Sequence, residues 1–303
     1  MLYQKHRPKT FEQVIGNKSL ITTLKNTCKD TSKIPHAILL VGGTGCGKTT
    51  LARIIASMLE CNANNLIEID TAVFNGIDTV RDINKSSQFT PLGGGNRVFI
   101  IDEVHRMTAD AQNAFLKILE DTPPHIYFIL CTTNENSLIP TVRGRCSRYQ
   151  VSLLSDNEMS VLLTSVCKKE KQTIETEVLD SIIKSAQGHP RNALTILEQV
   201  LATPEDKRLK VAERAQELEV EAIELCRALL ARKQWGTISK ILKSLKGQDD
   251  AESIRRMVLG YMSSVLLNKE DDQCALVLEC FREPFYNTNF PGLVLACYQV
   301  CKG

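Results

Sequence analysis

The fold is decided by the stretch Ala37-Ile38-Leu39-Leu40-Val41-Gly42-Gly43-Thr44-Gly45-Cys46-Gly47-Lys48-Thr49-Thr50-Leu51-Ala52. A run of apolar residues ends in glycines and a helical pattern follows, which predicts a buried strand, a loop and the start of a helix. The loop carries the pattern G-x-x-x-x-G-K-T, which is typical of a phosphate-binding loop when it lies between a strand and a helix. A glycine-rich turn without a ligand is the alternative, and the complete motif disfavours it. The stretch therefore predicts a nucleoside-triphosphate site.

The chemistry of this loop follows from its residue types. Glycines allow successive backbone N–H groups to converge on a polyphosphate, because no Cβ blocks the approach and left-handed dihedral angles cost little. The N-terminus of the following helix adds positive potential. We expect Lys48 to reach the β- and γ-phosphates and the Thr49 hydroxyl to ligate Mg²⁺. The residues expected to hold the nucleotide here are Gly42, Gly43, Thr44, Gly45, Cys46, Gly47, Lys48, Thr49 and Thr50.

Two carboxylates follow a second apolar run, residues 98–101. The run predicts a strand buried on both faces, and ligands of open α/β sheets bind where such strands end. We expect Asp102 to hold Mg²⁺ and Glu103 to act as the general base on the attacking water. A simple polar cap is the alternative, which the phosphate loop upstream disfavours. A further strand at residues 66–69 lies between the two along the chain. This arrangement is similar to that of ATPases with an inserted strand rather than to nucleotide kinases or small GTPases.

Polar residues also follow the apolar strand predicted at residues 126–131. Thr133 and Asn134 would face the same edge of the sheet as Asp102. There a hydroxyl or an amide could orient water or contact the γ-phosphate. A helix cap or a turn explains these residues equally well.

Arginines gather in the polar segment 141–148, which contains Arg143, Arg145 and Arg148. A solvated basic loop is one interpretation. The other is that one arginine reaches the triphosphate of a neighbouring subunit as a finger in trans. The residue pattern favours neither. Arg191, at the start of a later predicted helix, could reach back to the nucleotide, although a lone surface arginine is the commoner outcome.

The organisation of the chain is read from its helix signals. Residues 2–16 form a basic lead-in that we expect to be extended. A capping box of Ser155 and Glu158 opens a helical unit. Residues 203–208 form a charged linker, and the pattern is helical from there to the end. We therefore expect three units, at residues 1–152, 153–203 and 204–303.

Composition narrows the class of protein. The formal net charge is +2, so any contact with nucleic acid must come from a local basic surface. The 11 cysteines include no C-x-x-C pair, which favours reduced thiols in the cytosol over disulfides or a zinc site. The N-terminus is polar and no apolar run is long enough to cross a bilayer, so secretion and membrane insertion are disfavoured.

Several motifs occur in an order that resembles one family, the clamp-loader ATPase subunits of the AAA+ class. This family includes bacterial DNA polymerase III gamma/tau, the replication factor C small subunits and their phage counterparts. The resemblance covers residues 3–200. It implies an α/β P-loop domain with a parallel sheet flanked by helices, an α-helical lid and an all-α collar for oligomerisation. Besides the phosphate loop, the motifs are residues 7–16, Asp102-Glu103-Val104-His105, residues 113–121 with Pro123-Pro124, Thr133-Asn134 and residues 188–194.

The resemblance assigns roles to further residues. It places Arg7, Pro8, Val14 and Ile15 in the adenine pocket, Thr133 and Asn134 at sensor 1, and Arg191 at sensor 2 beside the γ-phosphate. The trans-acting motif of the family reads Ser-Arg-Cys, and this chain has Gly144-Arg145-Cys146 at that position. Arg145 is therefore the expected finger, without the serine that precedes it in relatives.

Two departures from gamma/tau bear on cofactors and length. Only Cys61 remains in the interval where gamma/tau carries a four-cysteine module, so we expect no zinc. The short segment 70–81 is closer to replication factor C small subunits. A length of 303 residues lacks the long tail of tau and suits a phage or otherwise minimal clamp loader.

The function implied by the resemblance is ATP hydrolysis within a ring of subunits, pentameric and homo- or hetero-oligomeric. The ring would open a sliding clamp and load it onto primer–template DNA in the cytoplasm of a bacterial or phage-infected cell. Arg81 and Arg106 would contact DNA phosphates, and residues 71–91 would face the clamp. The alternatives are another AAA+ DNA-remodelling ATPase, such as a branch-migration motor, and a scaffold subunit that does not hydrolyse ATP.

Overall fold

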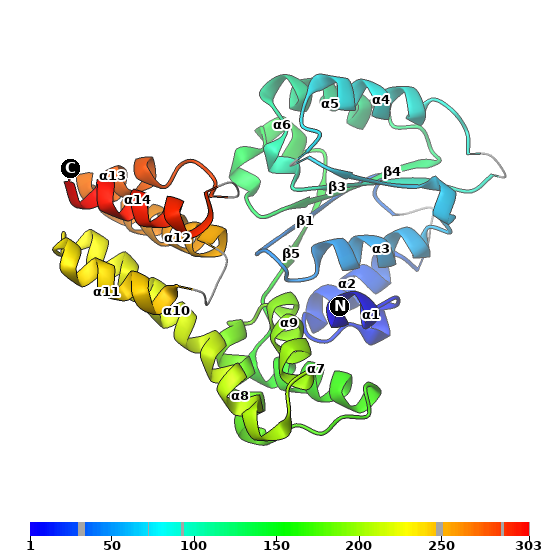
Figure 1. Cartoon of the computed structure of the whole chain (residues 1–303). Helices are drawn as coiled ribbons and strands as arrows, with labels where there is room; N and C mark the ends of the chain where they lie inside the picture. The colour runs from blue at the N-terminus through cyan, green and yellow to red at the C-terminus, as the bar shows by residue number, and fades with distance from the viewer. Residues whose placement is uncertain (30–33, 72, 92–93, 247–250, 286–287, 303) are drawn as a thin grey trace. The chain divides into compact units, whose positions relative to one another are not determined.

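The computed structural model describes residues 1–29, 34–71, 73–91, 94–246, 251–285 and 288–302. Residues 214–220, 253 and 268 are described by their backbone alone. The chain forms two compact units, Met1–Ala202 and Thr203–Gly303 (Figure 1). The lid expected at residues 153–203 belongs to the same compact unit as the core, and its separation from the core remains a prediction.

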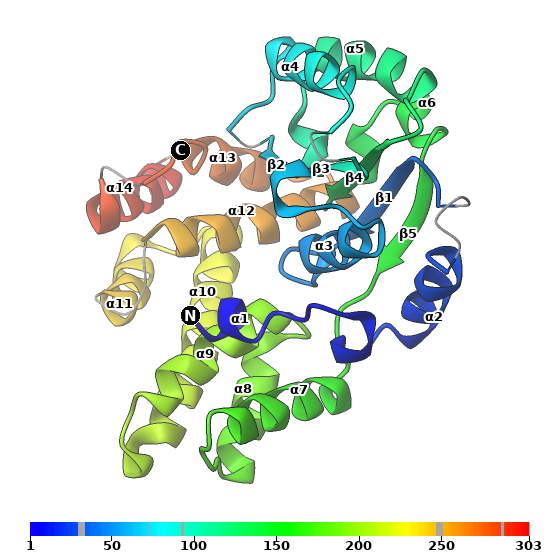
Figure 2. The ribbon, with the colours of Figure 1, turned by 90° about the vertical axis from the view of Figure 1, so that its right-hand side faces the viewer.

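The first unit is built on a five-stranded parallel sheet in the order β2-β3-β4-β1-β5, which confirms the predicted fold class. Helices cover both faces: α2 and α3 lie on one, α4 and α5 on the other (Figures 1 and 2). Successive side chains of a strand point to opposite faces, so Leu40 packs on the α3 side and Leu39 on the α5 side. The strands are β1 (Ala37–Gly42), β2 (Leu66–Asp70), β3 (Arg97–Asp102), β4 (Ile126–Thr132) and β5 (Ser147–Val151), and the helices of this part are α2 (Lys18–Thr27), α3 (Lys48–Met58), η3 (Ala63–Asn65), α4 (Ile77–Ser87), η4 (Val104–Arg106), α5 (Ala109–Glu120), η5 (Glu135–Ser137) and α6 (Pro140–Arg143).

The strand register brings the functional ends of three strands to one edge. Val41 pairs with Thr132 across β1 and β4, and Ile101 pairs with Leu130 across β3 and β4. β4 therefore separates β1 from β3. The strand predicted at residues 66–69 is present as β2, but it lies at the edge of the sheet beyond β3. The carboxyl ends of β3 and β4, which carry Asp102 and Thr132, consequently lie beside the phosphate loop that follows β1.

Two segments differ from the sequence-based expectation. The lead-in, expected to be extended, contains the helix α1 (Leu2–Lys5) and the turn η1 (Phe11–Gln13). The polar segment 141–148, for which a solvated loop was one of two interpretations, overlaps the helix α6 and the start of the edge strand β5. Every second residue of β5 from Arg148 is exposed, so the strand lacks the apolar run by which its neighbours were found. In both segments tertiary packing decides the structure rather than local pattern.

The helical parts follow the capping signals. Ser155 and Glu158 form the predicted capping box at the start of α7. The first unit ends with α7 (Asp156–Lys169), α8 (Thr176–Ala186) and α9 (Pro190–Leu201). The second unit contains η6 (Glu205–Lys207), α10 (Arg208–Leu230), α11 (Trp235–Leu245), α12 (Ala251–Asn268), α13 (Asp272–Cys280) and α14 (Asn289–Lys302).

A buried ion pair fixes the second unit. Glu252 and Arg255 on α12 are 3% and 10% exposed, and Arg255 Nη2 lies 2.7 Å from Glu252 Oε1. Arg255 also donates to the backbone carbonyls of Phe281 and Arg282, and the Phe285 N–H donates to Glu252. The hydrogen bond from Arg255 is the main reason that the pKa of Glu252 falls from 4.5 to about 2.

We expect Glu252→Gln to destabilise the second unit by about 3 kcal/mol at pH 7, because it leaves the Arg255 charge buried without its partner. The folded-state pKa lies below the unfolded one, so the pair stabilises the fold above pH 4.5 and loses this effect as the pH falls towards 2. The stability of the Glu252→Gln variant should therefore fall less than that of the wild type between pH 4.5 and 2. Trp235, the only tryptophan, reports unfolding of this unit by fluorescence. Glu279→Gln, in an exposed pair with Arg282, is the control and should cost under about 1 kcal/mol; equal losses would contradict the prediction.

Candidate nucleotide-binding site

A cavity of about 370 Å³ lies in the first unit where the phosphate loop, the lead-in and the lid helices meet. Its apolar wall includes Val14, Leu154 and Leu194, which suits a planar base, and its polar end is formed by the loop and the β3 carboxylates. The predicted residues that line it are Arg7, Pro8, Val14, Ile15, Thr44, Gly45, Cys46, Gly47, Lys48, Thr49, Thr50, Asp102, Glu103 and Arg191.

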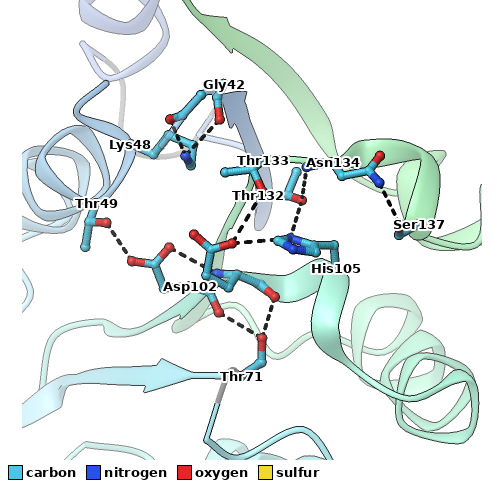
Figure 3. A network of polar contacts seen from close by, with 12 residues as sticks. Gly42, Lys48, Thr49, Thr71, Asp102, His105, Thr132, Thr133, Asn134 and Ser137 are labelled. Carbon is cyan, nitrogen blue, oxygen red and sulfur yellow. Dashed lines mark hydrogen bonds and ion pairs between the residues drawn. The ribbon is translucent and has the colours of Figure 1, made fainter. Parts of the chain in front are cut away.

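The loop has the conformation that a phosphate cradle needs. Gly45 and Gly47 have φ values of +70° and +107°, which favour glycine, and Gly47 caps α3. A Cβ on Gly45 would lie 3.2 Å from Cβ of Arg191, so the loop also passes close to the lid. Lys48 is buried, and its Nζ donates to the carbonyls of Gly42 and Gly43 at 2.8 Å (Figure 3). The ammonium group is thus held inside the loop.

One hydrogen bond joins the loop to the neighbouring strand end. Thr49 Oγ1 donates to Asp102 Oδ2 at 2.7 Å, and the Glu103 N–H donates to Asp102 Oδ1 at 3.0 Å (Figure 3). Hydroxyl and carboxylate oxygens are the ligands that Mg²⁺ prefers, and it usually takes one or two carboxylates besides substrate phosphates. The donor set fits that ion. The described residues contain no group of three or more His, Cys, Asp or Glu side chains that could hold a metal ion.

Glu103 is held by His105 of the adjoining turn η4 and by two residues from neighbouring strand ends, Thr71 and Thr133. It has a φ of +51°. Thr133 Oγ1 donates to its Oε2 at 3.4 Å, and Nδ1 of His105 lies 3.5 Å from the same oxygen. The fully buried Thr71 places its hydroxyl 2.9 and 2.6 Å from the carbonyl oxygens of Asp102 and Glu103 (Figure 3). From the sequence, Thr71 was expected only at the start of the clamp-facing segment and His105 only as part of the Asp102-Glu103-Val104-His105 motif, and neither was expected to contact Glu103. For Thr71 the available signal was its position directly after β2.

Asn134 acts as a helix cap, which is the alternative that the sequence left open for it. Its Oδ1 accepts from the Asn136 N–H at 3.1 Å, so the side chain caps η5. Its Nδ2 donates to Ser137 Oγ at 2.8 Å (Figure 3). Of the two residues after Thr132, Thr133 is the one that contacts Glu103.

The lid contributes two side chains at the start of α9. Arg191 lines the cavity, with its guanidinium 5.7 Å from the ring centroid of Tyr3. His189 Nδ1 lies 2.7 Å from the Thr44 carbonyl oxygen and joins the lid to the phosphate loop. His189 was identified only as part of the motif at residues 188–194, because a contact between residues 145 positions apart leaves no local pattern.

The arginines predicted for the finger and for DNA contact, Arg145, Arg81 and Arg106, are not among the residues that line this cavity. Arg145 donates to the Thr141 carbonyl at 2.9 Å and pairs with Glu120 of its own chain. Arg81 pairs with Asp78 at 2.7 Å and is 63% exposed, and Arg106 is exposed.

We expect the pKa of His105 to lie below 6.5, because burial disfavours the imidazolium. The Glu103 carboxylate partly offsets this effect, so Glu103→Gln should lower the pKa of His105 further. NMR titration of the imidazole resonances measures both values. A pKa above 6.5 in the wild type, or a rise in the variant, would show that the two side chains are arranged differently.

The loop, the paired strand ends and the sheet order define the class as a P-loop protein with an AAA+ fold. The solved structures agree: the Thermotoga maritima RuvB Holliday junction branch migration motor matches with a TM-score of 0.61 and 21% identity, over 74% of this chain and 79% of that chain. A second structure of that motor has a TM-score of 0.63 at 20% identity, over 75% of this chain and 80% of that one. At such identities the likeness establishes the fold alone.

Sequence relatives define the family. DNA polymerase III subunit gamma/tau of Mycobacterium bovis is 34% identical over 68% of this chain and 39% of its own length. Subunit tau of Bacillus subtilis is 32% identical over 96% of this chain and 53% of its own length. A family model described as DNA polymerase III, delta subunit, matches residues 63–155, and one described as Zeta toxin matches residues 18–81. The chain belongs to the gamma/tau-like family of AAA+ clamp-loader subunits.

The chain spans about 39% and 53% of these two relatives. In the described parts of the chain, none of the helices has the length and apolarity needed to cross a bilayer. All eleven cysteines are free.

Proposed function

We propose that this protein is an ATP-hydrolysing subunit of a clamp loader, which opens a sliding clamp and loads it onto primer–template DNA. The observation that carries the proposal is the convergence of Lys48, Thr49, Asp102 and Glu103 on one cavity in a member of the gamma/tau-like family. An intact set of this kind argues against a scaffold role without turnover. We place the protein in the cytoplasm with the replication machinery.

In this proposal each side chain has one task. Lys48 binds the β- and γ-phosphates, and Thr49 and Asp102 hold Mg²⁺, which neutralises charge on the phosphate oxygens when bound. Glu103 accepts a proton from the attacking water. Thr133 donates a hydrogen bond to the Glu103 carboxylate and so orients it towards the water. Arg191 contacts the γ-phosphate from the lid side of the cavity. The absence of zinc remains part of the proposal.

Arg145 would act in trans, on the nucleotide of the adjacent subunit. Its side chain is not among the residues that line the cavity of its own chain, and its own Glu120 and Thr141 hold it. A finger supplied by a neighbour makes hydrolysis depend on assembly of the ring, either homo- or hetero-oligomeric and pentameric.

We expect Arg145→Ala to lower ATP turnover about 10³-fold in the assembled loader with clamp and primed DNA, by analogy with arginine fingers of GTPases. ATP binding by the single chain should be unchanged. Arg148→Ala is the matched control, because Arg148 forms a bidentate pair with Glu135 in its own chain. Lys48→Ala, which removes the phosphate-binding ammonium group, gives the turnover expected without catalysis at this site. If Arg145→Ala keeps wild-type turnover, the assignment of the finger fails.

Contacts to DNA and clamp complete the proposal. Arg81 and Arg106 would bind phosphates, so binding should weaken as salt rises. Val73, Phe74 and Phe89 are 69%, 61% and 68% exposed in the segment proposed to face the clamp. Residue 72 of that segment lies outside the described residues.

The alternative is a branch-migration motor, which the shared fold alone would permit. A motor of that kind hydrolyses ATP while it translocates, without a clamp. Hydrolysis that requires both clamp and primed DNA distinguishes the proposed function from this one.

A further inference from the structure

The N-terminal helix α1 is attached to the lid at two places. The terminal amino group lies 3.4 Å from Glu198 Oε1 on α9, and Lys5 Nζ lies 2.7 Å from Oε1 of Glu170, the residue that caps α7. Leu2 is buried, and α1 lies beside α9 (Figure 2). A segment of the lead-in is therefore fixed against the helices that close the cavity.

Tyr3 belongs to this helix, and its side chain lines the nucleotide-binding cavity. Its ring faces the guanidinium of Arg191, with 5.7 Å between Cζ and the ring centroid, and both residues line the cavity. Among the described residues no carboxylate pairs with Arg191. A π face attracts a cation without occupying its N–H donors. The ring thus restrains the guanidinium while its donors stay available for an anion.

We propose that Tyr3 is a positioning residue of the nucleotide site, which holds Arg191 towards the terminal phosphate of a bound triphosphate. This inference rests on the proposed role of Arg191. Because Tyr3 acts through Arg191, its loss should weaken the binding of ATP and leave that of ADP nearly unchanged. A purely structural role in docking α1 would weaken both nucleotides alike. A ring that stacked on the base would do the same.

The test is equilibrium binding of fluorescent ATP and ADP analogues to the full chain. Tyr3→Leu should weaken ATP binding by roughly three- to thirtyfold, the range of a cation–π contact, with ADP within about twofold of wild type. Tyr3→Phe retains the ring and should bind both nucleotides as the wild type does. Lys5→Ala removes one of the two side chains that pair with Glu170 and leaves His6 paired with it, so α1 stays attached and the ATP-to-ADP ratio should be unchanged.

A double-mutant cycle separates the possible failures. Tyr3→Leu combined with Arg191→Ala should bind ATP no more weakly than Arg191→Ala alone. Full additivity, or equal losses for ATP and ADP in a Tyr3→Leu protein with unchanged thermal unfolding, would overturn the inference. If Arg191→Ala lowers ATP preference and Tyr3→Leu does not, only the role of Tyr3 fails. If Arg191→Ala changes nothing, the proposed role of Arg191 fails first, and the inference with it.

Discussion

The hydrogen bond between Thr49 and Asp102 is the interaction on which the rest of the site depends. Thr49 belongs to the helix after β1 and Asp102 ends β3, and β4 lies between these strands in the sheet. The two side chains can meet only because all three strands run parallel and end at the same level. Any shift of register by one residue would turn Asp102 to the other face of the sheet. Sheet register, rather than the loop alone, therefore brings together the two side chains that we propose to hold Mg²⁺.

The lid side of the site depends on contacts of a different kind. His189 contacts the Thr44 carbonyl, Arg191 lies beside Gly45, and α1 is paired with α7 and α9. These contacts join the beginning of the chain, the phosphate loop and the lid around one cavity. A nucleotide bound there would touch all three, so we expect its binding to depend on the position of the lid. Arg145 lies outside this set and is held by Glu120.

Much of the fold could be predicted because the pattern is local. The apolar runs before Gly42, Asp102 and Thr132 are continuous, since these strands are buried on both faces. The capping box at Ser155 is likewise contained in four residues. The sequence did not predict β5, because this edge strand exposes Arg148 and Gln150 and lacks a continuous apolar run. It did not predict α1 either, because this helix has only four residues and packs against α9, which is distant in sequence.

The residues of the site likewise fall into those that belong to local motifs and those that the fold brings together. Lys48, Thr49, Asp102 and Glu103 lie in contiguous motifs whose chemistry is legible in sequence. Thr71, His105 and His189 act through hydrogen bonds to residues that only the folded chain brings near. Thr133 and Asn134 were indistinguishable by residue type, and the turn at η5 decides between them by occupying the Asn134 side chain.

The central claim is that the phosphate loop and the end of β3 together bind a nucleotide with Mg²⁺. Calorimetric titration of ATP into the chain, with Mg²⁺ and with EDTA, measures this directly. The account predicts that Mg²⁺ tightens binding to the wild type and to Thr22→Val, which removes a hydroxyl that bonds only within α2, and that Thr49→Val loses most of this gain. A Thr49→Val protein with the full effect of Mg²⁺ would contradict the account.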